Sequence, residues 1–171
     1  KRQIQQALKN GAVIGVAENK QQVQGLFRML KNYYSSKVFK YFPGVDFFTS
    51  LLELGEECGE MGKIFTVSYN GKIIGGSCCL FSDDTAFLLF SGGMRKSYPS
   101  LYPGVLAVWN AMLYSREKGY SHFEFIDAGL PFKKYGYRDF ILRFGGKQLS
   151  TRRWYRLKWK WLNRIMEKIY V

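Results

Sequence analysis

The chain has 171 residues, of which 47% are hydrophobic and 23% charged, a globular composition that excludes a disordered or collagen-like chain. The net charge of +13 points to anionic partners, and the 18% of aromatic residues can fill a large core. The sequence has no run of 18 apolar residues, so we expect no membrane-spanning helix.

The first third of the chain predicts three helices and one short strand. Gly11 is a helix stop, Asn19 introduces the second helix, and Asp46 can cap the third. In chain order the predicted elements are a helix over 1–10, a strand over 12–16, and helices over 21–34 and 47–57.

The middle of the chain predicts a three-strand meander over 64–69, 73–81 and 86–91. The Asn70-Gly71 pair between the first two strands is a strong hairpin signal. Gly75-Gly76 marks a bulge or a close backbone approach, and Gly92-Gly93 closes the third strand.

The last third begins with a helix that Pro103 opens and Gly119 ends. A strand over 122–126 follows, with Asp127 at its end. After a basic, aromatic loop, a final strand containing Tyr155, Leu157 and Trp159 leads into an amphipathic helix over 161–170. A meander followed by strand–helix–strand predicts an α/β (α+β) fold with mixed strand pairing.

The cysteines and the single histidine argue against several site types. Cys58, Cys78 and Cys79 have no metal-ligand spacing, and we read them as reduced residues of a cytoplasmic protein. His122 opens a strand, and we expect it to be structural. No hydrolase triad and no metal site are predicted.

The positive charge is concentrated at the C-terminal end. Residues 133–171 hold twelve basic and two acidic residues, a net charge of +10, whereas the first 132 residues carry +3. Such a region attracts tRNA, anionic lipid headgroups or the phosphates of a nucleotide-type cofactor, or it is simply a solvated surface.

Several motifs, in this order, resemble the GNAT acyltransferase superfamily and, more closely, its FemAB-like branch. The segment Lys1–Gly11 is similar to the branch's Arg-x-x-Ile-x-x-Ala-x-x-x-Gly entry segment, and Gly71–Gly76 to its Gly-Lys-hydrophobic-hydrophobic-Gly-Gly hairpin. Asp127–Gly129, Tyr135–Phe140 and Phe144–Gly146 resemble its C-terminal signature.

This resemblance implies a GNAT-like, largely antiparallel central sheet flanked by helices. It also implies that residues 1–171 form one GNAT-like domain, equivalent to the C-terminal half of a longer protein with two such halves. The chain departs from the branch at Ile141, where relatives have Lys. In the extended segment expected here, Arg143 shares a face with Ile141 and could substitute. The Arg/Gln-x-x-Gly-x-Gly/Ala motif of acetyl-CoA users is not found between Ser91 and Leu106.

Donor binding is expected at the helix that Pro103 opens, because a helix N-terminus offers free backbone N–H groups. The candidate residues are Arg95, Lys96 and Gly104, although the two cations could also be incidental. Arg138 and Arg143 lie among tyrosines in the basic loop, where they would bind donor phosphates or be solvated.

The candidate catalytic residues are Asp127 and Tyr135. Asp127 follows a strand at the expected cleft, where it could orient or deprotonate an amine, or only make backbone hydrogen bonds in a turn. Tyr135 is expected close to the same chemistry.

The resemblance implies an acyltransferase or aminoacyltransferase that modifies an amine. Its donor is acyl-CoA, such as acetyl-CoA, or aminoacyl-tRNA. Its acceptor is a small molecule or a peptidoglycan precursor. The alternative is a non-catalytic GNAT-like module that binds tRNA or an anionic membrane surface through its basic C-terminal region.

Overall fold

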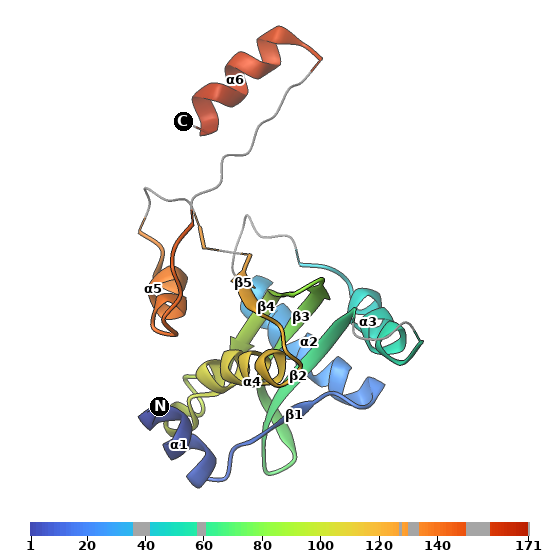
Figure 1. The fold of residues 1–171 in the computed structure, drawn as a ribbon, viewed down its shortest axis with the longest axis vertical. Coiled ribbons are helices and arrows are strands. Elements are labelled where there is room, and N and C mark those ends of the chain that lie inside the picture. Colours follow the sequence, from blue (N-terminus) through green and yellow to red (C-terminus); the bar gives the residue numbers. More distant parts are fainter. Residues whose placement is uncertain (36–41, 58–60, 127, 130–133, 150–157, 171) are drawn as a thin grey trace. The chain divides into compact units, whose positions relative to one another are not determined.

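The computed structural model describes residues 1–35, 42–57, 61–126, 128–129, 134–149 and 158–170. The chain divides into two compact units, Lys1–Asp127 and Ala128–Val171, called here the first and second units. The elements of the first unit are labelled in Figure 1. They are α1 (Arg2–Lys9), β1 (Val13–Val16), α2 (Lys20–Ser35), α3 (Val45–Glu57), β2 (Gly62–Tyr69), β3 (Lys72–Ser82), β4 (Thr85–Gly93), the 3-10 turn η1 (Pro99–Leu101), α4 (Pro103–Glu117) and β5 (His122–Phe125). The second contains α5 (Gly136–Leu142) and α6 (Lys160–Tyr170).

The first unit is built on one five-stranded sheet in the order β1-β2-β3-β4-β5. The first four strands pair antiparallel, and β5 joins β4 in parallel. The β2–β3 hairpin turns at Asn70 and Gly71, whose φ angles of 49° and 74° are those of a type I′ turn. The predicted meander and mixed pairing are confirmed.

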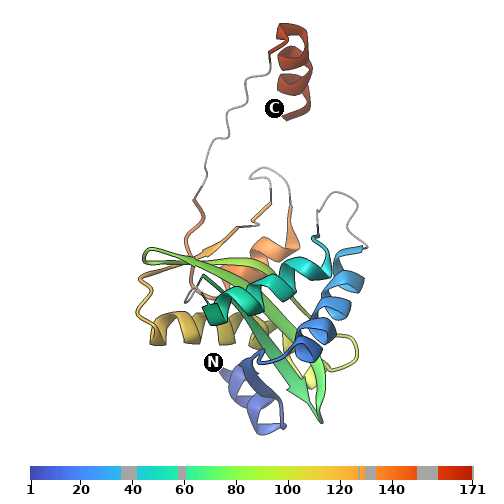
Figure 2. The same ribbon diagram turned by 90° about the vertical axis from the view of Figure 1, so that its right-hand side faces the viewer.

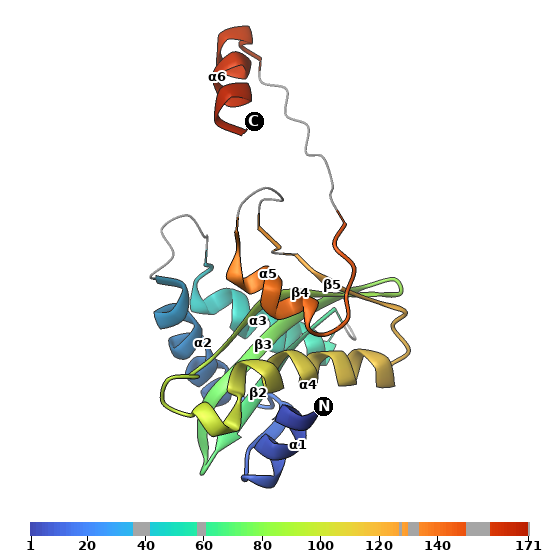
Figure 3. The ribbon, with the colours of Figure 1, turned by 90° about the vertical axis from the view of Figure 1, so that its left-hand side faces the viewer.

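Helices cover both faces of this sheet. Figure 3 shows α4 in front of the strands with α2 and α3 behind them, and Figure 2 gives the view from the other side. The α2–α3 side holds a core that includes Leu26, Leu30 and Phe48, all fully buried. The α4 side holds a second core with Val67, Ile74 and Leu106.

Most helix boundaries agree with those predicted. Asn19 caps α2, because its Oδ1 accepts a hydrogen bond from Gln22 N at 2.9 Å. The third helix begins two residues earlier than predicted, at Val45, so Asp46 lies in its first turn instead of capping it. The third strand of the meander was predicted to end at residue 91, before Gly92-Gly93. In the structure, Gly92 and Gly93 are the last two residues of β4.

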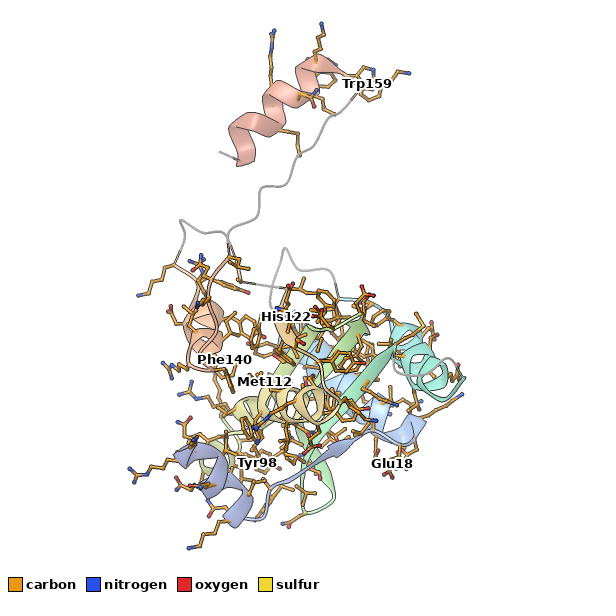
Figure 4. The ribbon with its side chains drawn as sticks, in the orientation of Figure 1. Glu18, Tyr98, Met112, His122, Phe140 and Trp159 are labelled. Atoms are coloured by element: carbon orange, nitrogen blue, oxygen red, sulfur yellow. The ribbon has the colours of Figure 1, made fainter. Side chains whose placement is uncertain are left out.

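Two predictions at the C-terminal end differ from the structure. The basic loop and extended segment expected around Ile141 include a helix, α5, which continues to Leu142. Of the predicted final strand, Tyr155 and Leu157 lie outside the described residues, and Trp159 lies in a bend immediately before α6 (Figure 4).

Candidate functional site

The parallel pairing of β4 with β5 is short and ends in the middle of β4. Thr85–Leu88 pairs with His122–Phe125, and the last contact is from Ile126 N to Leu88 O at 3.4 Å. Beyond Leu88, β4 continues to Gly93 while paired to β3 alone. Its other edge therefore faces an opening in the sheet, where backbone N–H and C=O groups can pair with an extended ligand.

A β-bulge lies at the point where this opening begins. Cys78 pairs with Phe90 and Cys79 pairs with Leu88, so Leu89 has no partner in the β3 register. It has none in the β5 register either, which ends at Leu88. A bulge releases a residue from the ladder and re-aims its backbone groups, and bulges are enriched beside active sites.

Two cross-strand glycine pairs allow helices to approach the sheet closely on both faces. Gly75 pairs with Gly93, and Gly76 pairs with Gly92. A Cβ on Gly93 would clash with Gly104 N and lie 2.7 Å from Pro103 C, while one on Gly75 would lie 2.9 Å from Pro103 O. The first pair therefore fixes the N-terminus of α4 against the open end of β4.

The first turn of α4 presents one N–H group that has no acceptor. Pro103 has no N–H, and the amides of Val105 and Leu106 both donate to Tyr102 O, at 2.9 and 3.1 Å. Gly104 N is left without a carbonyl in this described turn, and a Cβ on Gly104 would meet nothing within 4 Å. A helix N-terminus with open space beside the Cα of Gly104 fits a phosphate or another anion.

Two of the cations predicted to bind the acyl donor lie in the loop that precedes η1 and α4 in the sequence. Arg95 and Lys96 are exposed and follow Gly93 in the loop before η1. Backbone hydrogen bonds hold the loop, with Arg95 N donating to Gly93 O at 2.8 Å and Tyr98 N to Met94 O at 3.0 Å. The structure thus brings the backbone N atoms of Arg95 and Gly104 to the same residue, Gly93.

A groove of about 440 Å³ lies along the same loop and was not predicted from the sequence. Asn10 of α1 spans part of it, with its Nδ2 3.4 Å from Ser100 O. The rings of Tyr69 and Tyr98 meet edge-to-face, with their centroids 6.1 Å apart; Tyr98 is labelled in Figure 4. Its lining comes from three segments distant in the sequence, Asn10, Tyr69 and 97–101, which no local motif connects.

The remaining predicted site residues lie at the end of the first unit or in the second. Asp127 lies outside the described residues. Tyr135 is the N-cap of α5, and its ring lies so close to Gly129 that a Cβ there would be 2.5 Å from Tyr135 Cδ1. Arg138 Nε donates a hydrogen bond to Ala128 O at 2.8 Å, and this bond ties Ala128 to α5.

The helical conformation of α5 corrects the predicted relation between Ile141 and Arg143. Arg143 is the C-cap of α5 with φ −66° and ψ −15°. Residues that are two positions apart in an α-helix are rotated by about 200° around its axis, so the side chains of Ile141 and Arg143 leave different faces. Arg143 therefore does not replace the side chain at position 141 in the way an extended segment would allow.

Cys78, Cys79 and His122 have no catalytic surroundings, and Cys58 lies outside the described residues. Burial raises the pKa of the Cys78 thiol to about 12 and that of Cys79 well above its usual value, so neither is a nucleophile. His122 pairs with Asp84 at 3.1 Å on the surface, three residue pairs from the end of the β4–β5 ladder. Within the described residues, no three His, Cys, Asp or Glu side chains gather as a metal site, and no helix is long and apolar enough to cross a membrane.

Comparison with known proteins gives one family match and a set of structural neighbours. The model of the acetyltransferase (GNAT) domain matches residues 1–134. An aminoglycoside acetyltransferase from an uncultured soil metagenomic sample, in complex with sisomicin, superposes with a TM-score of 0.60 and 15% identity, covering 88% of this chain and 99% of its own.

Two further structures show the same fold. An acetyltransferase from Streptococcus agalactiae has a TM-score of 0.60 and 20% identity, covering 82% of this chain and 85% of its own. Glucosamine-6-phosphate N-acetyltransferase from Arabidopsis thaliana has a TM-score of 0.61 and 11% identity, covering 86% and 99%. No curated protein matches the sequence. The predicted architecture of a mixed, largely antiparallel sheet flanked by helices is confirmed.

Proposed function

Because the chain belongs to the GNAT acetyltransferase domain family, we propose that it transfers an acetyl group from acetyl-CoA to the amine of a small molecule. The observation that carries this proposal is the opening between β4 and β5, with the Leu89 bulge at its start and the N-terminal turn of α4 at its far end. The three features lie along one strand, as an extended thioester donor requires.

The residues at this opening fit acetyl-CoA. Beyond Leu88, β4 pairs with β3 and not with β5, so backbone groups near the Leu89 bulge can pair with amide groups in the manner of an added strand. Gly104 N–H would donate a hydrogen bond to a phosphate oxygen, and Arg95 and Lys96 would neutralise the phosphate charge. When bound, acetyl-CoA supplies an activated acyl group, and the backbone released at the bulge would stabilise negative charge that develops on the acyl oxygen.

Proton transfer is assigned to Asp127 and Tyr135. Asp127 directly follows the segment in which β5 leaves β4, which supports a role in orienting or deprotonating the amine. Tyr135 would donate a proton to the departing thiolate, because a phenol can serve as a general acid. Arg138 and Arg143 would add charge on the donor side. The position of the Tyr135 ring requires a residue without a side chain at position 129, which is Gly129.

The proposed acceptor is an amine on a polar small molecule. Two neighbours support this class by name, one in complex with the aminoglycoside sisomicin and one a glucosamine-6-phosphate N-acetyltransferase. A FemAB-like reaction, with aminoacyl-tRNA as donor and a peptidoglycan precursor as acceptor, stays a prediction of the sequence resemblance. It uses the same amine chemistry with a far larger, polyanionic donor.

Isothermal titration with acetyl-CoA tests the donor site. We expect saturable binding that is weakened by the double variant Arg95→Ala/Lys96→Ala. The matched control is Lys118→Ala, which removes a cation at the C-terminal end of α4, about 20 Å along the helix from Gly104. Absence of acetyl-CoA binding, or equal effects of the two variants, would contradict the proposed donor site.

A thiol-release assay with aminoglycoside and amino-sugar acceptors tests the reaction itself. We expect Tyr135→Phe to lower kcat while leaving the affinity for acetyl-CoA unchanged, because only the proton donor is removed. Turnover of aminoacyl-tRNA without turnover of acetyl-CoA would instead identify the FemAB-like reaction.

A further inference from the structure

The C-terminal helix α6 has two chemically distinct faces that the acyl-transfer site does not use. Lys160, Asn163 and Arg164 follow one another at helical spacing on one face. The opposite face carries the apolar side chains Trp161, Leu162, Ile165 and Met166. Trp161 is 60% exposed and Ile165 46%, and Trp159 just before the helix is 60% exposed (Figure 4).

The surrounding sequence carries a strong excess of positive charge. Residues 140–170 hold nine Lys and Arg residues and one acidic residue, Glu167, which lies in α6. In the first unit, by contrast, acidic and basic residues are mixed, as in the ion pair of Lys20 with Glu53 at 2.7 Å. An exposed apolar face beside an excess of positive charge fits a partner that is both anionic and apolar.

We propose that α6 binds in the plane of an anionic lipid bilayer, with its Lys160–Arg164 face on the headgroups and its Trp161–Ile165 face in the acyl boundary. A helix of 11 residues is about 17 Å long, too short to span a bilayer but long enough to lie at its surface. Tryptophans at the start of the helix suit the headgroup level, where one side of the ring is apolar and its N–H is hydrated.

Other partners match fewer of these features. RNA would use the cations and could stack on the tryptophans, but it offers nothing to the aliphatic side chains of Leu162 and Ile165. A second copy of α6 could cover the apolar face, but it would bring like charges together. A bilayer containing anionic lipid satisfies both faces at once.

The test is co-sedimentation of the full chain with vesicles. Vesicles of phosphatidylcholine and phosphatidylglycerol in equal amounts should bind the chain, and vesicles of phosphatidylcholine alone should bind it far more weakly. Lys160→Gln/Arg164→Gln should weaken binding about fivefold for each charge removed. Trp161→Ser/Ile165→Ser, which keeps every charge, should weaken it by more than about tenfold.

Two matched controls isolate the helix. Lys9→Gln/Lys31→Gln removes two exposed charges from the first unit and should leave vesicle binding unchanged. Leu149→Ser removes an apolar side chain that is 81% exposed outside the helix and should also be silent. Circular dichroism and thermal melting of every variant verify that the fold is kept.

Four results would overturn the proposal. They are equal binding to neutral and anionic vesicles, no vesicle binding at all, binding to RNA that Trp161→Ser/Ile165→Ser does not weaken, and a dimer in light scattering that the same variant dissociates. None of them bears on acetyl-CoA binding, because no residue proposed to bind the donor lies in α6.

Discussion

The two units differ in the kind of contact that stabilises each of them internally. In the first unit the decisive contacts join residues far apart in sequence, such as Asn110 of α4, whose Nδ2 donates to Gly15 O of β1 at 2.8 Å. In the second unit they join near neighbours, such as Arg138 with Ala128 and Tyr135 with Gly129. Site geometry in the first unit therefore depends on sheet packing, whereas in the second it depends on local turns.

The largest expected effect comes from Gly93→Ala. The new methyl would meet backbone atoms of Pro103 and Gly104, which cannot move without displacing α4. We expect a loss of about 1–3 kcal/mol in the free energy of unfolding and a strong loss of acetyl-CoA affinity. Urea denaturation and isothermal titration measure the two.

Gly92→Ala is the matched control on the other face of β4. Its methyl would lie 2.9 Å from Leu30 Cδ2, the end of a side chain that can move. Stability should fall less, and acetyl-CoA affinity should be kept. If both variants lost the ligand equally, the contact of α4 with β4 would not be what positions the donor.

The second largest effect is expected from Asn110→Ala. This buried side chain donates to Gly15 O, and its Nδ2 is also 3.5 Å from Thr66 O, so it ties α4 to two strands. Its removal takes the shorter side-chain hydrogen bond from Gly15 O, which keeps the one from Thr66 Oγ1 at 3.4 Å, so the expected cost is about 1 kcal/mol. The urea midpoint should drop for Asn110→Ala and stay nearly constant for Asn32→Ala, an exposed asparagine of α2.

The contrast between the units also explains what the sequence could predict. The hairpin at Asn70-Gly71 and the limits of α4 at Pro103 and Gly119 follow from local backbone chemistry, and all were predicted. The close approach expected at Gly75-Gly76 is also present, because both glycines face a helix. Arg95, Lys96 and Gly104 were found as candidates because they cluster around one helix start.

The features that were missed depend on pairing between distant strands. The Leu89 bulge exists only because β4 gains a residue relative to β3, and the opening exists only because β5 ends its pairing at Leu88. No local pattern around Leu89 encodes either. The missed helix α5 had a local signal, since Tyr137, Phe140 and Phe144 recur at helical spacing and their rings pack at 5.8 and 5.5 Å.

A smaller and local effect is expected from Gly129→Ala in the second unit. Gly129 has φ +70°, and a Cβ there would lie 2.5 Å from the Tyr135 ring. Both the strain and the clash act on the segment before α5, so hydrogen exchange of α5 should accelerate while the urea midpoint of the first unit is kept. Gly146→Ala, whose methyl would meet nothing within 4 Å, is the control. A fall in the stability of the first unit would show that the two units unfold as one.

The smallest effect is expected at the surface pair of Asp84 and His122. Hydrogen bonds from the Thr85 side chain and then from His122 lower the pKa of Asp84. A carboxyl whose pKa is lowered on folding stabilises the protein above its unfolded pKa, about 3.9, and this contribution disappears as the pH falls through the folded value. Asp84→Asn should therefore lower the melting temperature slightly at neutral pH and not at strongly acidic pH.

The effect is small because both side chains are exposed and salt screens their interaction. Added salt should shrink the difference between Asp84→Asn and the parent chain, and Glu124→Gln, which removes an exposed charge from the same strand as His122, should produce no comparable pH dependence. A difference that persisted at acidic pH would mean that the Asp84 side chain stabilises the turn before β4 through its shape and hydrogen bonds, independently of its charge. That outcome would place this turn among the locally determined features, despite its position in the unit that distant contacts hold together.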